Sequence, residues 1–196
     1  MPAVPRWTSA IAEVVGSARP FGARIVFRQV VRAWGRLWEP VMSARWNIGF
    51  PALYAGLDLD VALTERLKRT GPMAVRLLVG RADALIARTV DLCDLSVLGQ
   101  LGLGTAELVG DQELPLELGA AILRAGVTGL LVPAAIAETA QLYPQFRLVR
   151  EGQTPEVRQT PPEGINLVIF TVNLVVGDRY PEIDRFTCEI RGLPAS

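Results

Sequence analysis

The chain has 196 residues, half of them hydrophobic, and its 20 basic residues balance 20 acidic ones to a formal net charge of zero. This balance gives no reason to expect direct binding to nucleic acid or to an anionic membrane. The sequence has no apolar run of about 18 residues or more, no secretory signal pattern and too few cysteines for a disulfide framework. We therefore expect a cytoplasmic protein without a membrane-spanning helix.

The first part of the chain predicts one helix followed by strands. A short helix is expected within residues 1–20, with Thr8 or Ser9 as its N-cap. The elements that follow are, in chain order, a strand over 23–31, a loop over 33–51 and a short strand over 52–57.

A second helix is predicted over residues 58–71, because Asp58 is a good N-cap and Gly71 and Pro72 stop a helix. The later elements are, in chain order, strands over 73–81 and 84–92 around a turn, an irregular segment over 97–104, a helix over 114–126, a strand over 129–135, a polar loop over 137–165, and strands over 166–176 and 185–193. No linker divides the chain and no regular crossover helices separate the strands. We therefore expect one α+β domain over residues 1–196, with a mostly antiparallel or mixed β core and flanking helices.

Histidine is absent, which excludes Ser-His-Asp and Cys-His nucleophilic machinery and zinc sites built on histidine. Cys93 and Cys188 cannot form a thiolate cage by themselves, so we expect no metal. The glycine-rich stretch "LGLGTAELVG" lacks the spacing of a dinucleotide or phosphate loop. Any chemistry therefore falls to carboxylates, Arg, Tyr, Ser, Thr or a bound cofactor.

Two arginines and a tyrosine have both structural and functional interpretations. Strand alternation places Arg28 on one face with Val26 and Val30, and an arginine in that position is usually solvated. Arg45 is either a loop arginine stacked on an aromatic ring or a fork for a phosphate or carboxylate. Tyr54 is either a core aromatic with its hydroxyl at the edge or a platform for base stacking.

Glu65 lies beside the apolar stripe of the helix predicted over 58–71, at its rim. The simplest interpretation is a surface pair with Arg69, four positions further along the helix. The functional alternative is a carboxylate that steadies a developing positive charge.

Five segments carry a resemblance to a known family when they are taken in order. They are "VFRQVV", "ARWNIGFPALYAGLDLDVALTE", "DLCDLSVLGQLGL", "LGAAILRAGVTGLLVPAA" and "NLVIF". Together they resemble the RES domain family over about residues 24–172. The densest match is the Arg-Trp-Asn run with the proline and Tyr54 that follow it, and then Glu65.

The resemblance implies an ADP-ribosyltransferase-like fold and a toxin of a bacterial toxin–antitoxin system. Such toxins consume NAD as a substrate, by phosphorolysis or hydrolysis, or transfer ADP-ribose to a protein. The implied partner is a cognate helix-turn-helix antitoxin that blocks the site. The apolar composition also favours protein contacts, including a homo-oligomer.

Family site residues carry over to four positions. Arg28 and Glu65 match the Arg and Glu of the family name and are the implied catalytic pair, and Arg28, Arg45 and Tyr54 are the implied NAD-binding residues. The family serine is replaced by Ala134 in "VPAA". Because alanine has no side-chain hydrogen-bonding group, a catalytically impaired binding module is an alternative, as is a protein ADP-ribosyltransferase.

Overall fold

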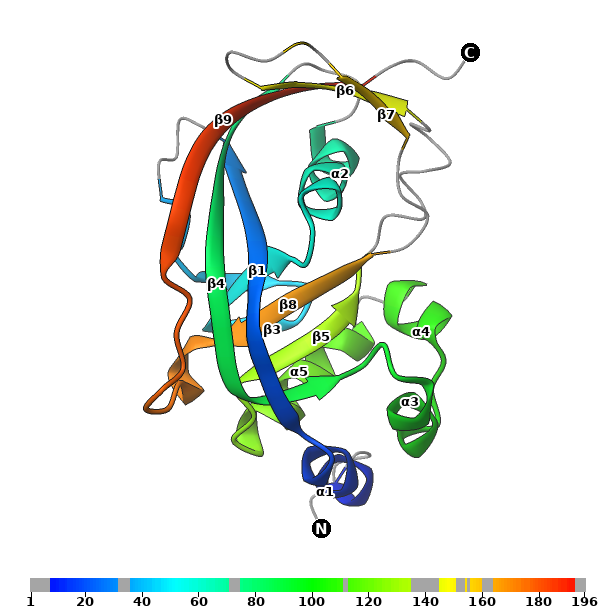
Figure 1. Cartoon of the computed structure of the whole chain (residues 1–196). Helices are drawn as coiled ribbons and strands as arrows, with labels where there is room; N and C mark the ends of the chain where they lie inside the picture. Colours follow the sequence, from blue (N-terminus) through cyan, green and yellow to red (C-terminus); the bar gives the residue numbers. More distant parts are fainter. Residues whose placement is uncertain are drawn as a thin grey trace.

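The computed structural model describes residues 8–31, 36–70, 75–110, 113–134, 145–150, 154, 156–159 and 164–192 (Figure 1). Its helices are α1 (Thr8–Gly16), α2 (Leu59–Thr70), α3 (Leu95–Leu101), α4 (Thr105–Gly110) and α5 (Glu113–Arg124), with the 3-10 turn η2 (Thr171–Asn173). Its strands are β1 (Arg19–Val31), β2 (Val41–Ala44), β3 (Asn47–Gly56), β4 (Val75–Asp91), β5 (Gly129–Pro133), β6 (Gln145–Arg150), β7 (Glu156–Gln159), β8 (Ile165–Phe170) and β9 (Glu182–Gly192).

The strands form one sheet of nine, in the order β1-β3-β8-β5-β4-β9-β6-β7, with β2 attached to β3. The β4–β5 pair is parallel, and the other described pairs are antiparallel. Because β1 also pairs with β4, the strands β1, β3, β8, β5 and β4 close into a ring. The prediction of an α+β fold with a mixed, mostly antiparallel sheet is confirmed.

Strand β4 runs without a break through the segment for which we predicted a turn. Gly80 and Arg81 pair with β1 on one side and with β9 on the other. Partners on both edges override the local turn preference of a Gly-Arg-Ala-Asp sequence, so the predicted turn was wrong. A Cβ at Gly80 would lie 3.0 Å from Leu37 Cδ1 and 3.1 Å from Trp38 Cζ2. The absence of a side chain at Gly80 therefore makes room for Leu37 and Trp38, and this glycine does not mark a turn.

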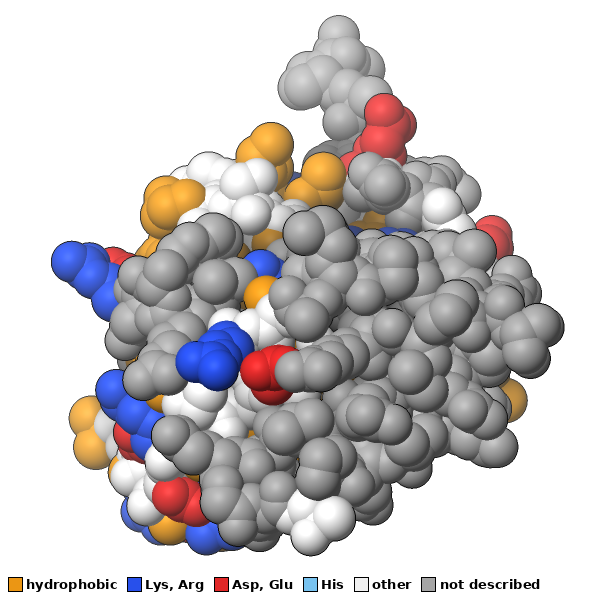
Figure 2. Space-filling view, turned by 90° about the horizontal axis from the view of Figure 1, so that it is seen from above, with side chains coloured by type: hydrophobic (Ala, Val, Ile, Leu, Met, Phe, Trp, Pro, Cys, Tyr) orange, Lys and Arg blue, Asp and Glu red, His pale blue; other side chains and the backbone are white. Residues whose placement is uncertain are grey.

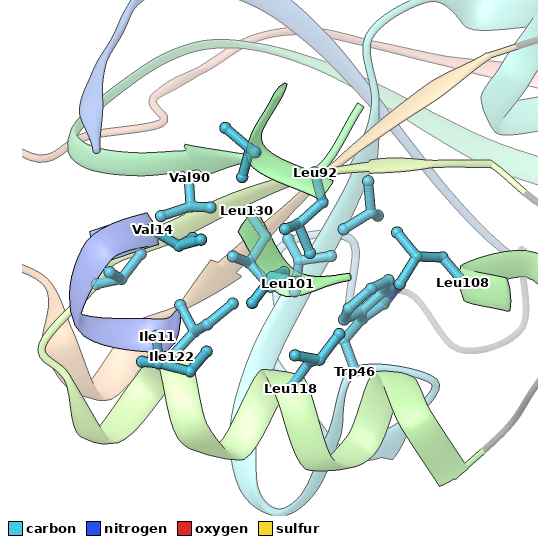
Figure 3. Close-up of a cluster of buried hydrophobic side chains, with 14 of the residues drawn as sticks. Ile11, Val14, Trp46, Val90, Leu92, Leu101, Leu108, Leu118, Ile122 and Leu130 are labelled. Carbon is cyan, nitrogen blue, oxygen red and sulfur yellow. The ribbon is translucent and has the colours of Figure 1, made fainter. Parts of the chain in front are cut away.

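Alternate residues of the central strands feed two apolar clusters. On β3, Leu53 belongs to one cluster and Ala52 to the other, and on β8 Ile169 and Val168 divide in the same way. The cluster that contains Ala52 and Val168 packs against α1, α3 and α5, as Figure 3 shows. The continuous apolar run of β8 is therefore explained by burial on both faces.

The predicted helices are confirmed where a capping residue marked them. Asp58 Oδ1 accepts a hydrogen bond of 2.8 Å from the Val61 N–H at the start of α2. Helix α5 is followed by Gly126 at φ +76°. The segment 97–104, predicted as irregular, instead contains most of α3, which Asp94 caps through the Ser96 N–H. The glycines of this segment favoured an irregular prediction, although Asp94 caps α3 and Val97, Leu98 and Leu101 form its buried apolar face.

The predicted loop over 33–51 was wrong at its C-terminal end, where β2 and β3 form a hairpin. Asn47 is fully buried, and its Nδ2 donates to the carbonyls of Val41 at 2.8 Å and Phe50 at 2.6 Å. An asparagine that satisfies two buried carbonyls stabilises a hairpin that strand propensity alone does not predict.

Two further boundaries differ from prediction. The loop predicted over 137–165 contains β6 and β7, and part of the remainder lies outside the described residues. Strand β8 ends at Phe170, before the predicted residue 176, because η2 turns the chain there. Among the helices of the described residues, none is long and apolar enough to cross a membrane.

Helix α5 packs directly on the turn between β2 and β3. A Cβ at Gly119 would lie 2.1 Å from the Trp46 carbonyl oxygen and 3.0 Å from its carbonyl carbon. Real Cβ atoms do not approach backbone so closely, so this position requires glycine. The β2–β3 turn and α5 thus lie so close together that only glycine fits at position 119.

Replacing Gly119 by alanine is expected to lower the free energy of unfolding by about 1–3 kcal/mol or more, since the backbone of one element must shift. The measurement is urea denaturation followed by circular dichroism. Gly99→Ala in α3 is the matched control, because nothing lies within 4 Å of a Cβ there. It should stabilise the protein by up to about 1 kcal/mol through helix propensity. Equal effects of the two changes would contradict the close-packing account.

Candidate functional site

A cavity of about 780 Å³ opens between α2 and the sheet. Its described walls come from β1, the segment 36–40, the β2–β3 hairpin, α2 and the ends of β5 and β8. The volume falls within the range of about 300–1,000 Å³ that small-molecule and cofactor pockets occupy. It brings together residues from distant parts of the sequence.

Arg28 lies in the wall of this cavity and is only 8% exposed. Its Nη1 donates to the Tyr54 carbonyl at 2.7 Å, and its Nη2 donates to the Glu39 carbonyl at 2.9 Å. The interpretation of Arg28 as a solvated residue was therefore wrong, because the segment 36–40 covers this face of β1. Strand alternation alone does not reveal such a cover.

Burial lowers the pKa of Arg28 to about 10, and nearby Tyr180 and Tyr54 oppose that shift. A pKa of about 10 leaves the guanidinium charged at neutral pH. Its Nε has no hydrogen-bond partner among the described residues. The structure thus places a positive charge, with limited solvation, against a cavity.

Glu65 lines the same cavity from α2. Its Oε1 accepts a hydrogen bond of 2.6 Å from Asn166 Nδ2, at the start of β8. The simplest interpretation, a surface pair with Arg69, is not tested, since the Arg69 side chain lies outside the described residues. The prediction that Glu65 sits at a rim agrees with its intermediate burial.

The Tyr54 hydroxyl stabilises the hairpin. It accepts from the Trp46 N–H at 2.9 Å and donates to Asn47 Oδ1 at 2.7 Å. Tyr54 also packs against the larger apolar cluster while lining the cavity. This arrangement matches the interpretation as a core aromatic, and the proposed contact with a ligand stays a prediction.

Arg45 holds the end of a helix. Its Nη2 donates to the carbonyls of Leu108, at 2.6 Å, and Val109, both in the last turn of α4. A cation at a helix C-terminus is favourable, because the unsatisfied carbonyls carry partial negative charge. Arg45 also lines the cavity. Its predicted role in holding a ligand remains a prediction.

The wall residues that sequence reasoning missed include Arg36, Glu39, Arg66 and Asn166. Arg36 and Glu39 form an exposed ion pair at 2.8 Å. Among the described wall residues, arginines outnumber glutamates by four to two, which suits an anionic ligand. Asn166 had a weak signal, since it opens the apolar run "NLVIF" as its polar first residue.

Ala134, at the position where the resemblance implies a serine, is buried at 7% exposure and packs against Val61 of α2. Its N–H donates to the Gly164 carbonyl at 2.8 Å. Among the described residues, the cavity wall includes Val132 and Pro133 of β5 but not Ala134. The Ala134 methyl group thus makes an apolar contact with Val61 behind the described wall of the cavity.

The two thiols lie outside the described cavity wall. Burial, together with the Asp91 carboxylate, raises the pKa of Cys93 to about 12. Cys188 is fully buried in the cluster between α2, β4 and β9. With that pKa the Cys93 thiol is protonated at neutral pH, which makes it a poor nucleophile. Within the described part of the chain, no group of three or more His, Cys, Asp or Glu is placed to hold a metal ion.

Comparison with known proteins adds a family to this geometry. The family model of the RES domain matches residues 18–188. The chain belongs to the RES domain family. A chain in the crystal structure of the M. tuberculosis MbcT–MbcA toxin–antitoxin complex has the same fold, with a TM-score of 0.61 and 15% identity over 91% of each chain. Among curated proteins, none matches the chain significantly.

The match to the RES domain covers every predicted site residue and extends beyond the predicted range of 24–172 at both ends. Arg28 and Glu65, the two residues matched to the family name, line one cavity. Arg45 and Tyr54 line it too, but the hydrogen bonds described above use them to maintain α4 and the hairpin. The geometry therefore divides these four predicted site residues into two pairs.

Removing the Tyr54 hydroxyl with Tyr54→Phe is expected to lower the free energy of unfolding by about 1–3 kcal/mol, because a buried N–H and a buried amide oxygen lose their partner. Urea denaturation measures this loss. The control is Tyr180→Phe, because among the described residues the Tyr180 hydroxyl makes no hydrogen bond. A loss of less than about 0.5 kcal/mol is expected there. If Tyr54→Phe unfolds as the wild type does, the hairpin does not depend on this hydroxyl.

Proposed function

We propose that the protein is a RES-type toxin that consumes NAD in the cytoplasm and is neutralised by a cognate helix-turn-helix antitoxin. The reaction is cleavage of the bond between nicotinamide and ribose, by hydrolysis or phosphorolysis. The observation that carries the proposal is the placement of Arg28 and Glu65 in the wall of one cavity of about 780 Å³. The toxin–antitoxin complex that shares the fold supports the role and the partner.

The cationic part of the cavity is suited to the NAD diphosphate. Arg28 is held by two backbone carbonyls, so its guanidinium is oriented before a ligand arrives. Low solvation strengthens its attraction for an anion. We assign the diphosphate first to Arg28, with Arg45 on the adjoining wall, because Arg45 Nη2 already holds α4. The ring of Tyr54 orients the nicotinamide end.

Glu65 supplies the charge that the reaction needs. When the bond from the ribose C1 atom to nicotinamide breaks, its electron pair leaves with nicotinamide, which becomes neutral. Positive charge then develops on the ribose, and a fixed carboxylate stabilises it. Water adds to that carbon and releases a proton, which gives ADP-ribose. Phosphate gives the phosphorylated sugar instead.

A second candidate function is an interaction module of the same fold without catalysis. It is favoured by Ala134, which removes the hydroxyl that the family carries. Its burial against Val61 means that the change affects the layer behind the described wall of the cavity. Such a module would keep its protein partner and leave NAD intact.

Purified wild-type protein incubated with NAD is expected to release nicotinamide, measured by chromatography. Glu65→Gln should lower the rate by roughly a hundredfold or more, since the charge is lost while the shape is kept. Glu117→Gln on the exposed side of α5 is the matched control and should keep the wild-type rate. An inactive wild type, or a fully active Glu65→Gln, contradicts the proposal. ADP-ribose carried by a protein after reaction with labelled NAD would indicate transferase chemistry.

Ala134→Ser separates the two candidate functions. If the wild type is the toxin proposed above, nicotinamide release should change by less than about threefold, because the methyl group lies behind the described wall. The same assay measures this rate, with binding to NAD followed by calorimetry. A variant that cleaves NAD when the wild type does not would favour the module and contradict the proposed activity.

A further inference from the structure

Asn166 is a buried polar side chain at the edge of the cavity, and neither the family pattern nor the proposed reaction has given it a role. It is 7% exposed and lies at the start of β8. Its Nδ2 donates to Glu65 Oε1 at 2.6 Å, across a separation of 101 residues in the chain. The contact therefore forms only when α2 and β8 are brought together by the fold.

The position of Asn166 is fixed from both sides. Strand β8 lies between β3 and β5, and Asn166 is paired with Gly56 of β3 and Val132 of β5. A Cβ at Gly56 would lie 3.0 Å from the Ala62 nitrogen, so α2 rests almost directly on β3 at this point. The strand that carries Asn166 and the helix that carries Glu65 are thus held at a set distance.

The chemistry of the contact determines the form of the carboxylate. An amide nitrogen can only donate, so it favours the ionised carboxylate, which only accepts. The amide therefore orients the carboxylate, and its N–H complements the negative charge of the carboxylate at the cavity.

We propose that Asn166 is a positioning residue, which holds the ionised Glu65 carboxylate against the cavity where positive charge develops on the ribose. This inference rests on the proposed function. Asn166 acts through Glu65, so its loss should lower turnover while NAD binding through Arg28 persists.

The charged and titratable neighbours of this contact are few. Among the described residues of the wall they are Arg28 of β1, Arg45 of the β2–β3 turn, Tyr54 of β3, Arg66 of α2 and, on the segment 36–40, Arg36 and Glu39. Strand β9 also packs on α2, and its Glu189 pairs with Arg76 of β4 at 3.4 Å. Apart from Glu65, Glu39 is thus the only carboxylate of the described wall, and it is already paired with Arg36.

Two variants of Asn166 test the proposal in the full chain. Asn166→Ala should lower kcat for nicotinamide release roughly tenfold to a hundredfold, as for loss of a hydrogen bond to a charged group. KM for NAD should stay within about threefold of the wild-type value. In a Glu65→Gln background, Asn166→Ala should produce no further fall in kcat, because the carboxylate that it positions is gone.

Asn166→Asp adds a readout that a purely structural role would not change. Where the two adjacent carboxyl groups share one proton, the protonated one donates to the other as the amide did. As pH rises that proton is lost, two adjacent negative charges repel, and activity should fall. The wild type and Asn166→Ala should lack this loss at high pH. Asn173→Ala is the matched control, since Asn173 Nδ2 likewise donates side-chain hydrogen bonds, to the part-buried carbonyls of Leu123 and Val127, away from the cavity.

The outcomes separate the two levels of the proposal. If the wild type leaves NAD intact, the proposed function is overturned, and this inference falls with it. If the wild type cleaves NAD while both Asn166 variants keep its kcat and pH profile, the inference alone is overturned. The same holds if Asn173→Ala lowers kcat of the folded protein as much as Asn166→Ala. Melting temperatures of all variants show how much protein is folded in each assay.

Discussion

A guanidinium group buried in a sheet must find acceptors, and those of Arg28 fix the elements around it. The Tyr54 carbonyl belongs to β3, and the Glu39 carbonyl belongs to the segment that covers β1. Taking away an acceptor would leave a buried charge without compensation, which is costly. The covering segment, β3 and β1 therefore keep their relative positions because one charge needs all three. The cavity lies against this charge. On the face of the molecule shown in Figure 2, the described basic and acidic side chains are interspersed.

The β2–β3 hairpin is stabilised by polar contacts inside an apolar setting. Tyr54 and Asn47 together satisfy the Trp46 N–H and two carbonyls, and the missing side chain of Gly119 lets α5 rest on the turn. Because each of these contacts is satisfied, the hairpin forms a rigid wall. Arg45 extends it to α4. The hydrogen bonds described for "SARWNIGFPALY" build a wall of the site, and the ligand role that the family resemblance implies for Arg45 and Tyr54 stays a prediction.

Local signals in the sequence predicted the elements that local chemistry determines. Asp58 and Gly126 marked the ends of helices because capping needs only near neighbours. The continuity of β4 could not be predicted, because it depends on pairing with β1 and β9. The burial of Arg28 was missed for the same reason, since its cover comes from another segment. The family resemblance selected Arg28 and Glu65, but the contact with Asn166 appears only once β8 is placed between β3 and β5.

The insertion of β8 between β3 and β5 has a consequence for synthesis on the ribosome. Until β8 emerges, β3 and β5 lack the strand that joins them, and the hydrogen bond from Asn166 to Glu65 cannot form. At about 5–20 residues per second, the 101 residues from Glu65 to Asn166 take on the order of 5–20 s to translate. A nascent chain therefore carries Arg28 and Glu65 before it has the strand that completes the cavity wall. The site can form only after β8 has been translated.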